Sequence, residues 1–191
     1  MLTGLFFGSF NPIHIGHLAI ANYVVEYTDI KELWFVVSPQ NPLKKRKGLL
    51  PDYHRITLVR EAIEEDKRFR ASDIEFKMPQ PSYTIDTLTY LQEKYPGRKF
   101  AIVMGADGLT SFHKWKNYEE IIKNYPRYIY PRPNVDIAKI ENKENCIFMN
   151  APLIEISSTF IRNGIREGKD MRYLLNERVY KYISEMHFYE K

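Results

Sequence analysis

The chain has 191 residues, 44% of them hydrophobic and 27% charged, which excludes an intrinsically disordered protein and predicts a single folded domain over 1–191. Its one cysteine, Cys146, excludes an internal disulfide and a cysteine-built zinc site. The sequence shows no signal-peptide pattern and no apolar run near ~18 residues, and it therefore predicts a cytoplasmic protein. The net charge of +4 suits an anionic partner, without choosing between a small molecule and a nucleic acid.

Apolar runs and helical patterns alternate along the first third of the chain. Residues 2–7 and 33–37 are short unbroken apolar runs, the pattern of strands that are covered on both faces of a sheet. Residues 17–28 and 52–65 carry apolar side chains at helical spacing. A proline-rich, loop-like segment at 38–51 precedes the second of these helices. The first helix is predicted to face the core through Ile20, Tyr23, Val24 and Tyr27.

The same alternation continues to the end of the chain. The remaining predicted elements are strands at 69–76, 100–104, 127–130 and 146–149, helices at 83–94, around 118–122, at 158–167 and at 176–187, and a loop or short helix at 105–115. Ser82 and Ser157 are expected to be helix N-caps. The order predicts an α/β fold with a Rossmann-like, doubly wound parallel sheet and a small C-terminal helical part over about 157–191. Such sheets bind ligands at the carboxyl ends of their strands, where the strand order reverses.

The stretch GSFNPIHIGH, residues 8–17, joins the first strand to the first helix. Gly8 allows a ligand to approach the backbone, and the start of a helix favours an anion. His14 and His17 can both donate hydrogen bonds to phosphate oxygens. A structural corner with two solvated histidines and a metal site are the alternatives, but two imidazoles without a nearby third ligand make a poor zinc site. The full ten-residue pattern favours a phosphate site.

The stretch ISSTFIR, residues 156–162, offers a second phosphate site. Ser157, Ser158 and Thr159 bring hydroxyls and backbone N–H groups to a helix start, which suits a polyphosphate. Arg162 lies about one turn further on and can hold phosphate with two parallel hydrogen bonds. An N-capped surface helix is the alternative, because Ser and Thr are common caps.

Both stretches resemble signatures of the nucleotidylyltransferase superfamily, G-x-F-x-P-x-H-x-G-H and I-S-S-T-x-I-R, in the same order and at a fitting separation. Three segments between them, SPQNPLK (38–44), PSYTIDTL (81–88) and GADGLTSFHKW (105–115), resemble the bacterial nicotinate mononucleotide adenylyltransferases. The resemblance covers nearly the whole chain. It implies transfer of the adenylyl group of ATP to nicotinate mononucleotide, which gives deamido-NAD and pyrophosphate, a step of NAD biosynthesis.

The resemblance also implies which residues bind ATP. Asp107 corresponds to an acid near the adenosine ribose, and Gly105 allows the ribose to approach; a turn residue is the alternative for Asp107. The catalytic residues are expected to be His14, His17 and Arg162. The residues assigned to ATP are Gly8, Ser9, Phe10, His14, His17, Gly105, Asp107, Ile156, Ser157, Ser158, Thr159 and Arg162.

The acceptor is expected to bind through Asn11, Lys44, Tyr83, Thr84 and Trp115. Tyr83 and Thr84 stand at a predicted helix start, whose N–H groups suit the nicotinate carboxylate. Trp115 offers a flat face to the positively charged pyridine ring, and Lys44 could meet the substrate phosphate. Trp115 as a core residue and Thr84 as a helix cap are the alternatives. Asn11 stands where many family members have Asp, which leaves the choice between acid and amide substrates open.

The expected mechanism is in-line attack of the acceptor phosphate on the α-phosphorus of ATP. The attacking phosphate has its second pKa at about 6, so it is ionised near neutral pH and needs no general base. Catalysis then rests on positioning and on stabilising charge. Mg²⁺ is expected to arrive with ATP and to keep mostly water and phosphate ligands, so no protein metal site is predicted.

Other functions remain as alternatives. The acceptor could be nicotinamide mononucleotide or phosphopantetheine, or the chain could be a non-catalytic nucleotide sensor, although His17 and Arg162 are both present. A nucleic-acid binder could use the basic run at 44–47 and the 14 tyrosines, but the tyrosines fall at helix-core spacing. No nucleic acid and no membrane is expected as a partner. The sequence leaves open whether the chain forms a homo-oligomer, which metal works best and whether loop 39–51 closes on the substrate.

Overall fold

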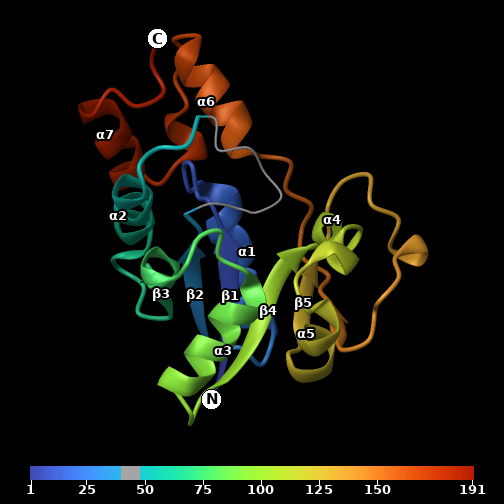
Figure 1. Cartoon of the computed structure of the whole chain (residues 1–191). Coiled ribbons are helices and arrows are strands. Elements are labelled where there is room, and N and C mark those ends of the chain that lie inside the picture. Colours follow the sequence, from blue (N-terminus) through green and yellow to red (C-terminus); the bar gives the residue numbers. More distant parts are fainter. Residues whose placement is uncertain (40–47) are drawn as a thin grey trace.

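In the computed structural model, which describes residues 1–39 and 48–191, the described strands form a six-stranded, all-parallel sheet in the order β3-β2-β1-β4-β5-β6 (Figure 1). The strands are β1 (Leu2–Gly8), β2 (Glu32–Val37), β3 (Phe69–Ser72), β4 (Lys99–Gly105), β5 (Arg127–Tyr130) and β6 (Cys146–Phe148). The α-helices are α1 (Ile15–Tyr27), α2 (Asp52–Ile63), α3 (Thr84–Lys94), α4 (Ala106–Leu109), α5 (Tyr118–Asn124), α6 (Ser158–Arg166) and α7 (Glu177–Glu185). The order reverses between β1 and β4, as expected of a doubly wound sheet.

Helices cover both faces of the sheet, and successive strand residues serve opposite faces. Phe6 and Phe35 pack in a core with α1, α2, α6 and α7, while Leu5 and Trp34 pack in a second core with α3 and α5. Because side chains alternate along a strand, a strand that is buried on both sides must be apolar throughout. This is why the runs at 2–7 and 33–37 could be recognised as strands.

Three local predictions were wrong. The strand predicted at 69–76 ends at Ser72, and Ile74–Lys77 form a 3₁₀ turn. Ser82 does not cap α3: its hydroxyl donates to the Glu75 carboxylate, and Tyr83 occupies the N-cap position. Tyr27, predicted to face the core, is 73% exposed and stacks on Tyr23. By contrast, Ser157 caps α6 as expected, because its Oγ accepts from the Phe160 N–H.

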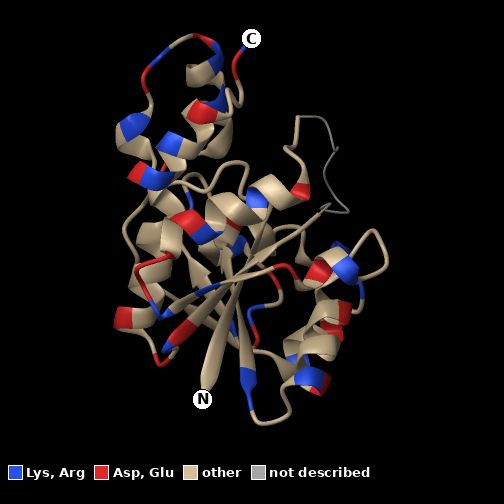
Figure 2. Cartoon of the chain, turned by 90° about the vertical axis from the view of Figure 1, so that its left-hand side faces the viewer, with Lys and Arg blue, Asp and Glu red and all other residues tan. Residues whose placement is uncertain are grey.

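The last helix, α7, packs beside α2 (Figure 1). Arg178 at the start of α7 pairs with Glu64 and Glu65, which directly follow α2. Acidic and basic segments are interspersed along the described ribbon (Figure 2). Within the described ranges, no helix combines the length and the apolar character that crossing a membrane needs.

Candidate active site

A cavity of about 560 Å³ opens at the carboxyl ends of β1 and β4, where the strand order reverses. Every residue that the sequence assigned to ATP or to catalysis lines this cavity. Four of the five acceptor residues also line it: Asn11, Tyr83, Thr84 and Trp115. The fifth, Lys44, lies outside the described residues, as does most of the loop at 39–51.

The turn after β1 is tight and buried. A Cβ on Gly8 would lie as close as 2.8 Å to the Phe10 ring, so the position admits only glycine without a shift. Phe10 has a φ of +44°, in the left-handed region that few non-glycine residues adopt. Its ring is 2% exposed and packs edge-on against His17. Phe10 therefore contributes mainly its backbone to the cavity wall.

A buried arginine, which the sequence analysis did not find, ties this turn to its neighbours. Arg55 of α2 is fully buried and donates to the carbonyl oxygens of Ser9 and Ser38, both at 2.8 Å, and of Leu50 at 3.0 Å. These carbonyls belong to the segments after β1 and β2 and before α2. A buried guanidinium whose N–H groups bond several carbonyls fixes those segments relative to one another.

His14 and His17 are neutral at physiological pH. Burial, with the positive charge of Arg132 adding to it, lowers the pKa of His14 to about 4. Burial and the neighbouring His14 and Arg132 hold the pKa of His17 well below its usual range. The two rings lie 3.8 Å apart between centroids at the start of α1. Each can therefore serve an incoming phosphate as a neutral donor with one N–H.

The tautomer of His17 follows from a backbone contact. The His14 backbone N–H donates to His17 Nδ1 at 3.3 Å, so Nδ1 carries no proton and the neutral ring is protonated at Nε2. An N–H at Nε2, the far side of the ring from that backbone bond, is a suitable donor to a phosphate oxygen in the cavity. The fixed tautomer removes the need to reorganise the ring when the charge arrives.

The two sequence motifs, about 145 residues apart, contact each other directly. Ser158 Oγ donates to the Pro12 carbonyl at 2.9 Å, and an Arg162 N–H donates to the Asn11 carbonyl at 2.8 Å. A second Arg162 N–H donates to Thr159 Oγ1 at 3.2 Å. A guanidinium has five N–H donors, so three remain for a phosphate after these two bonds. The hydroxyl proton of Ser158 is used on Pro12, which leaves its backbone N–H for a ligand.

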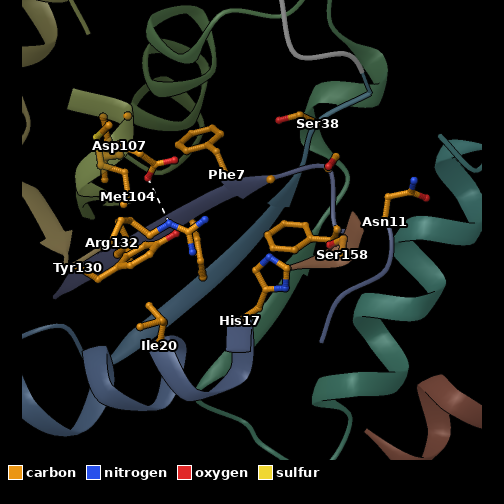
Figure 3. A pocket seen from close by; sticks show the side chains of 18 of the residues that line it. Phe7, Asn11, His17, Ile20, Ser38, Met104, Asp107, Tyr130, Arg132 and Ser158 are labelled. Carbon is orange, nitrogen blue, oxygen red and sulfur yellow. Dashed lines mark ion pairs between the residues drawn. The ribbon is translucent and has the colours of Figure 1, made fainter. Parts of the chain in front are cut away.

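Arg132 and Tyr130 form a wall that the sequence analysis missed. Arg132 follows β5 and lies between Asp107 and Tyr130 above His17 (Figure 3). Its Nε is 3.4 Å from Asp107 Oδ1, and a Cβ on Gly105 would lie 3.0 Å from its side chain. The signal was available: Arg132 comes two residues after the end of β5, at the edge of the parallel sheet where ligands bind.

The α3 side of the cavity carries the predicted acceptor residues. Thr84 is the first residue of α3, and Tyr83 is its N-cap, so the alternative that Thr84 caps the helix is wrong. Lys116 pairs with Asp86 at 2.8 Å and lies 5.0 Å from the centre of the Tyr83 ring. Trp115 is half-buried and packs on Phe112, with 4.9 Å between ring centroids. Trp115 is thus both a core residue and part of the wall.

Glu75 is a buried acid beside this wall, and the sequence analysis missed it as well. Its carboxylate accepts from Ser82 Oγ at 2.7 Å and from Thr87 Oγ1 at 2.9 Å. Burial raises the pKa of Glu75, and these hydroxyls offset part of that rise. Within the described ranges, no group of three or more His, Cys, Asp or Glu side chains is arranged to hold a metal ion.

Comparison with known proteins identifies the family and agrees with the fold. The profile of the cytidylyltransferase-like family matches residues 5–164. Two curated relatives named "Probable nicotinate-nucleotide adenylyltransferase" share half of their residues with this chain: the one from Flavobacterium psychrophilum is 50% identical over 100% of both chains, and the one from Christiangramia forsetii 51% over 98% of both. A solved Plasmodium falciparum nicotinic acid mononucleotide adenylyltransferase complexed with NaAD superimposes with a TM-score of 0.84 over 98% of this chain and 97% of that one, at 20% identity.

The fold and the paired motifs are thus those of a cytidylyltransferase-like protein. Within that family, the identity of about one half over the full length is decisive. The chain belongs to the nicotinate-nucleotide adenylyltransferases.

Proposed function

We propose that the protein acts in NAD biosynthesis by joining ATP and nicotinate mononucleotide to give deamido-NAD and pyrophosphate. The observation that carries this is the meeting of both phosphate-binding motifs in one cavity, through the Ser158–Pro12 and Arg162–Asn11 contacts. The half-identical, full-length relatives support the same reaction. We place the reaction in the cytoplasm, which fits a chain with a single cysteine.

The transfer is a direct in-line displacement. An oxygen of the nicotinate mononucleotide phosphate forms a bond to the α-phosphorus of ATP while the bond from that phosphorus to the bridging oxygen of the β-phosphate breaks. Pyrophosphate leaves with the electron pair. The attacking phosphate is already ionised near neutral pH, so the chain need not supply a base. The neutral state of both histidines fits this, because they act as hydrogen-bond donors to the phosphates.

On the ATP side, each group has a distinct role. His14 and His17 donate to the α- and β-phosphates as charge develops, and Arg162 holds the leaving pyrophosphate with its remaining N–H groups. Asp107 accepts from the ribose of adenosine, beside Gly105. Mg²⁺ enters as part of the substrate, bound to the phosphate oxygens and water, and neutralises part of their charge.

On the acceptor side, the backbone N–H groups at the start of α3, from Tyr83 and Thr84 onward, receive the nicotinate carboxylate. Trp115 stacks on the pyridinium ring, which gains from the ring's positive charge. The Asp86 carboxylate neutralises Lys116, so the wall beside Tyr83 carries no net positive charge from this pair. Selection of the acid over the amide then depends on the N–H donors.

The first experiment measures pyrophosphate release from MgATP with nicotinate mononucleotide and with nicotinamide mononucleotide, side by side. A strong preference for the acid supports both the reaction and the carboxylate site at α3. Equal use of the two acceptors, or a preference for nicotinamide mononucleotide, would support adenylyl transfer but contradict the carboxylate site at α3. Absence of release with either acceptor, while MgATP still binds, would favour another phosphorylated acceptor or a nucleotide sensor on the same fold.

A further inference from the structure

The C-terminal end of the chain reaches back to the first motif. The chain leaves α7 at Glu185 and turns through His187 and Tyr189, both with positive φ. Phe188 packs edge-on against His54 at 4.5 Å between ring centroids, which fixes the turn. The hydroxyl of Tyr189 then donates to Asn11 Oδ1 at 2.9 Å, across 178 positions of sequence.

Asn11 connects the C-terminal segment to other parts of the chain through hydrogen bonds. Its side chain is buried, with the residue 2% exposed. Oδ1 accepts from the Leu50 N–H at 3.1 Å as well as from Tyr189, and Nδ2 donates to the Gly48 carbonyl at 2.9 Å. The Asn11 backbone carbonyl accepts from Arg162.

This pattern requires an amide at position 11. An amide both accepts, from Leu50 and Tyr189, and donates, to the Gly48 carbonyl. A carboxylate in the same place would set a negative oxygen against that carbonyl and lose the bond. The presence of Asn rather than Asp thus follows from contacts within the chain. Burial raises the pKa of Tyr189, so its hydroxyl keeps the proton that it donates.

We propose that Tyr189 is a positioning residue for adenylyl transfer: by holding the Asn11 amide it fixes the Asn11 carbonyl to which Arg162 is bound, and with it the segment 48–50 at the edge of the cavity. The name of the reaction rests on the proposed function, but the contact itself does not. Without the hydroxyl, Asn11 loses one of its three side-chain bonds, and Arg162 binds to a less fixed carbonyl.

The test is Tyr189→Phe, which removes only the hydroxyl. Tyr173→Phe is the matched control, because Tyr173 belongs to the same C-terminal part and is 87% exposed. Loss of one positioning hydrogen bond is expected to lower kcat about three- to tenfold, with the KM for MgATP changed less than about twofold, because Arg162 acts most on the departing pyrophosphate. The affinity for pyrophosphate, measured by calorimetry, should fall by a similar factor.

A purely structural role would give a different result. Tyr189→Phe would then lower Tm while kcat, measured well below Tm, and the Kd for pyrophosphate stay at the wild-type values; this outcome overturns the proposal, as does an equal loss in Tyr173→Phe. The double variant with Asn11→Ala tests whether Tyr189 acts through Asn11. Once the amide is removed, Tyr189→Phe should have little further effect on pyrophosphate affinity. The pyrophosphate measurement needs no acceptor, so it decides the role of Tyr189 even if nicotinate mononucleotide is not turned over.

Discussion

At the residue scale, the proposed site offers uncharged hydrogen-bond donors that the protein itself holds in place. Burial, with a smaller contribution from Arg132, lowers the pKa of both imidazoles and keeps them neutral, and the His14 backbone fixes the His17 tautomer. A neutral donor in a buried cavity gains more from charge that develops in the transition state than from the ground state. The histidines should therefore affect the rate more than the binding of ATP.

His17→Ala tests this. We expect kcat to fall on the order of 100-fold, as for loss of one preorganised donor, while the Kd for MgATP rises only a few-fold. Steady-state kinetics and calorimetry give the two values. His113→Ala, at an exposed position outside the cavity, should leave both unchanged. Equal turnover in His17→Ala and wild type would remove His17 from the catalytic residues.

Glu75 gives a second prediction, on stability. An acid whose pKa is raised in the folded state binds its proton more tightly there than when unfolded, so the free energy of unfolding falls as the pH rises above the ordinary pKa of 4.5. Glu75→Gln keeps the shape and removes this dependence. Denaturant unfolding between pH 4 and 8 should show that the free energy of unfolding of the variant increases relative to that of wild type as the pH rises.

The control for this series is Glu93→Gln, an exposed glutamate on α3, the helix that also carries Thr87. Its stability should track wild type across the pH range. If Glu75→Gln also tracks wild type at every pH, the carboxylate is as well solvated in the folded protein as in the unfolded chain, and the assignment of a buried acid is wrong.

At the element scale, the strands and the two motifs were predictable because their signals are local. Unbroken apolar runs mark the buried strands, and ten consecutive residues carry the first motif. The end of β3 was not predictable, since Glu75 in an alternating pattern resembles a solvent-facing strand residue. Its burial depends on hydroxyls at Ser82 and Thr87, which only the folded chain brings to it.

The same reason explains the other misses. Arg55 looks like a surface charge in a sequence, because no local pattern indicates the carbonyl oxygens that its guanidinium contacts. For Arg132, the place after β5 was a usable signal, but its pairing with Asp107 joins two loops that the sequence does not show as neighbours. Tyr27 shows the opposite error: helical spacing predicted a buried side chain, but the helix ends there and the ring stacks on Tyr23 in solvent. Contacts between distant segments decide these cases, and a single sequence does not contain them.

The cap of α6 yields a prediction at this scale. Ser157→Ala removes the acceptor for the Phe160 N–H and should lower the free energy of unfolding by about 1 kcal/mol. Because α6 also carries Arg162, a frayed first turn should lower kcat as well. Ser184→Ala is the matched control, since that hydroxyl donates within α7 and caps no helix. No loss of stability relative to this control would mean that α6 is held by its packing alone.

At the scale of the whole molecule, the reversal of strand order brings the two ends of the chain to one cavity. The first motif follows β1, the second begins α6, and direct hydrogen bonds join them. A change in structure at the cavity therefore affects the packing of the C-terminal helices. For the same reason, a phosphate ligand that binds both motifs stabilises the fold as a whole. This coupling makes the global stability a reporter of the charge state of the site.

The last prediction uses that coupling. His14 binds a proton in the unfolded chain below pH 6.5, but in the folded protein only below about pH 4. The free energy of unfolding should therefore fall as the pH is lowered through this window, by up to about 3 kcal/mol from His14, with His17 adding in the same direction. Unfolding of His14→Asn should lose much of this slope. Saturating pyrophosphate should restore stability most near pH 5, because the anion raises the folded-state pKa of both histidines; a pyrophosphate effect independent of pH would show that these imidazoles do not face the phosphates.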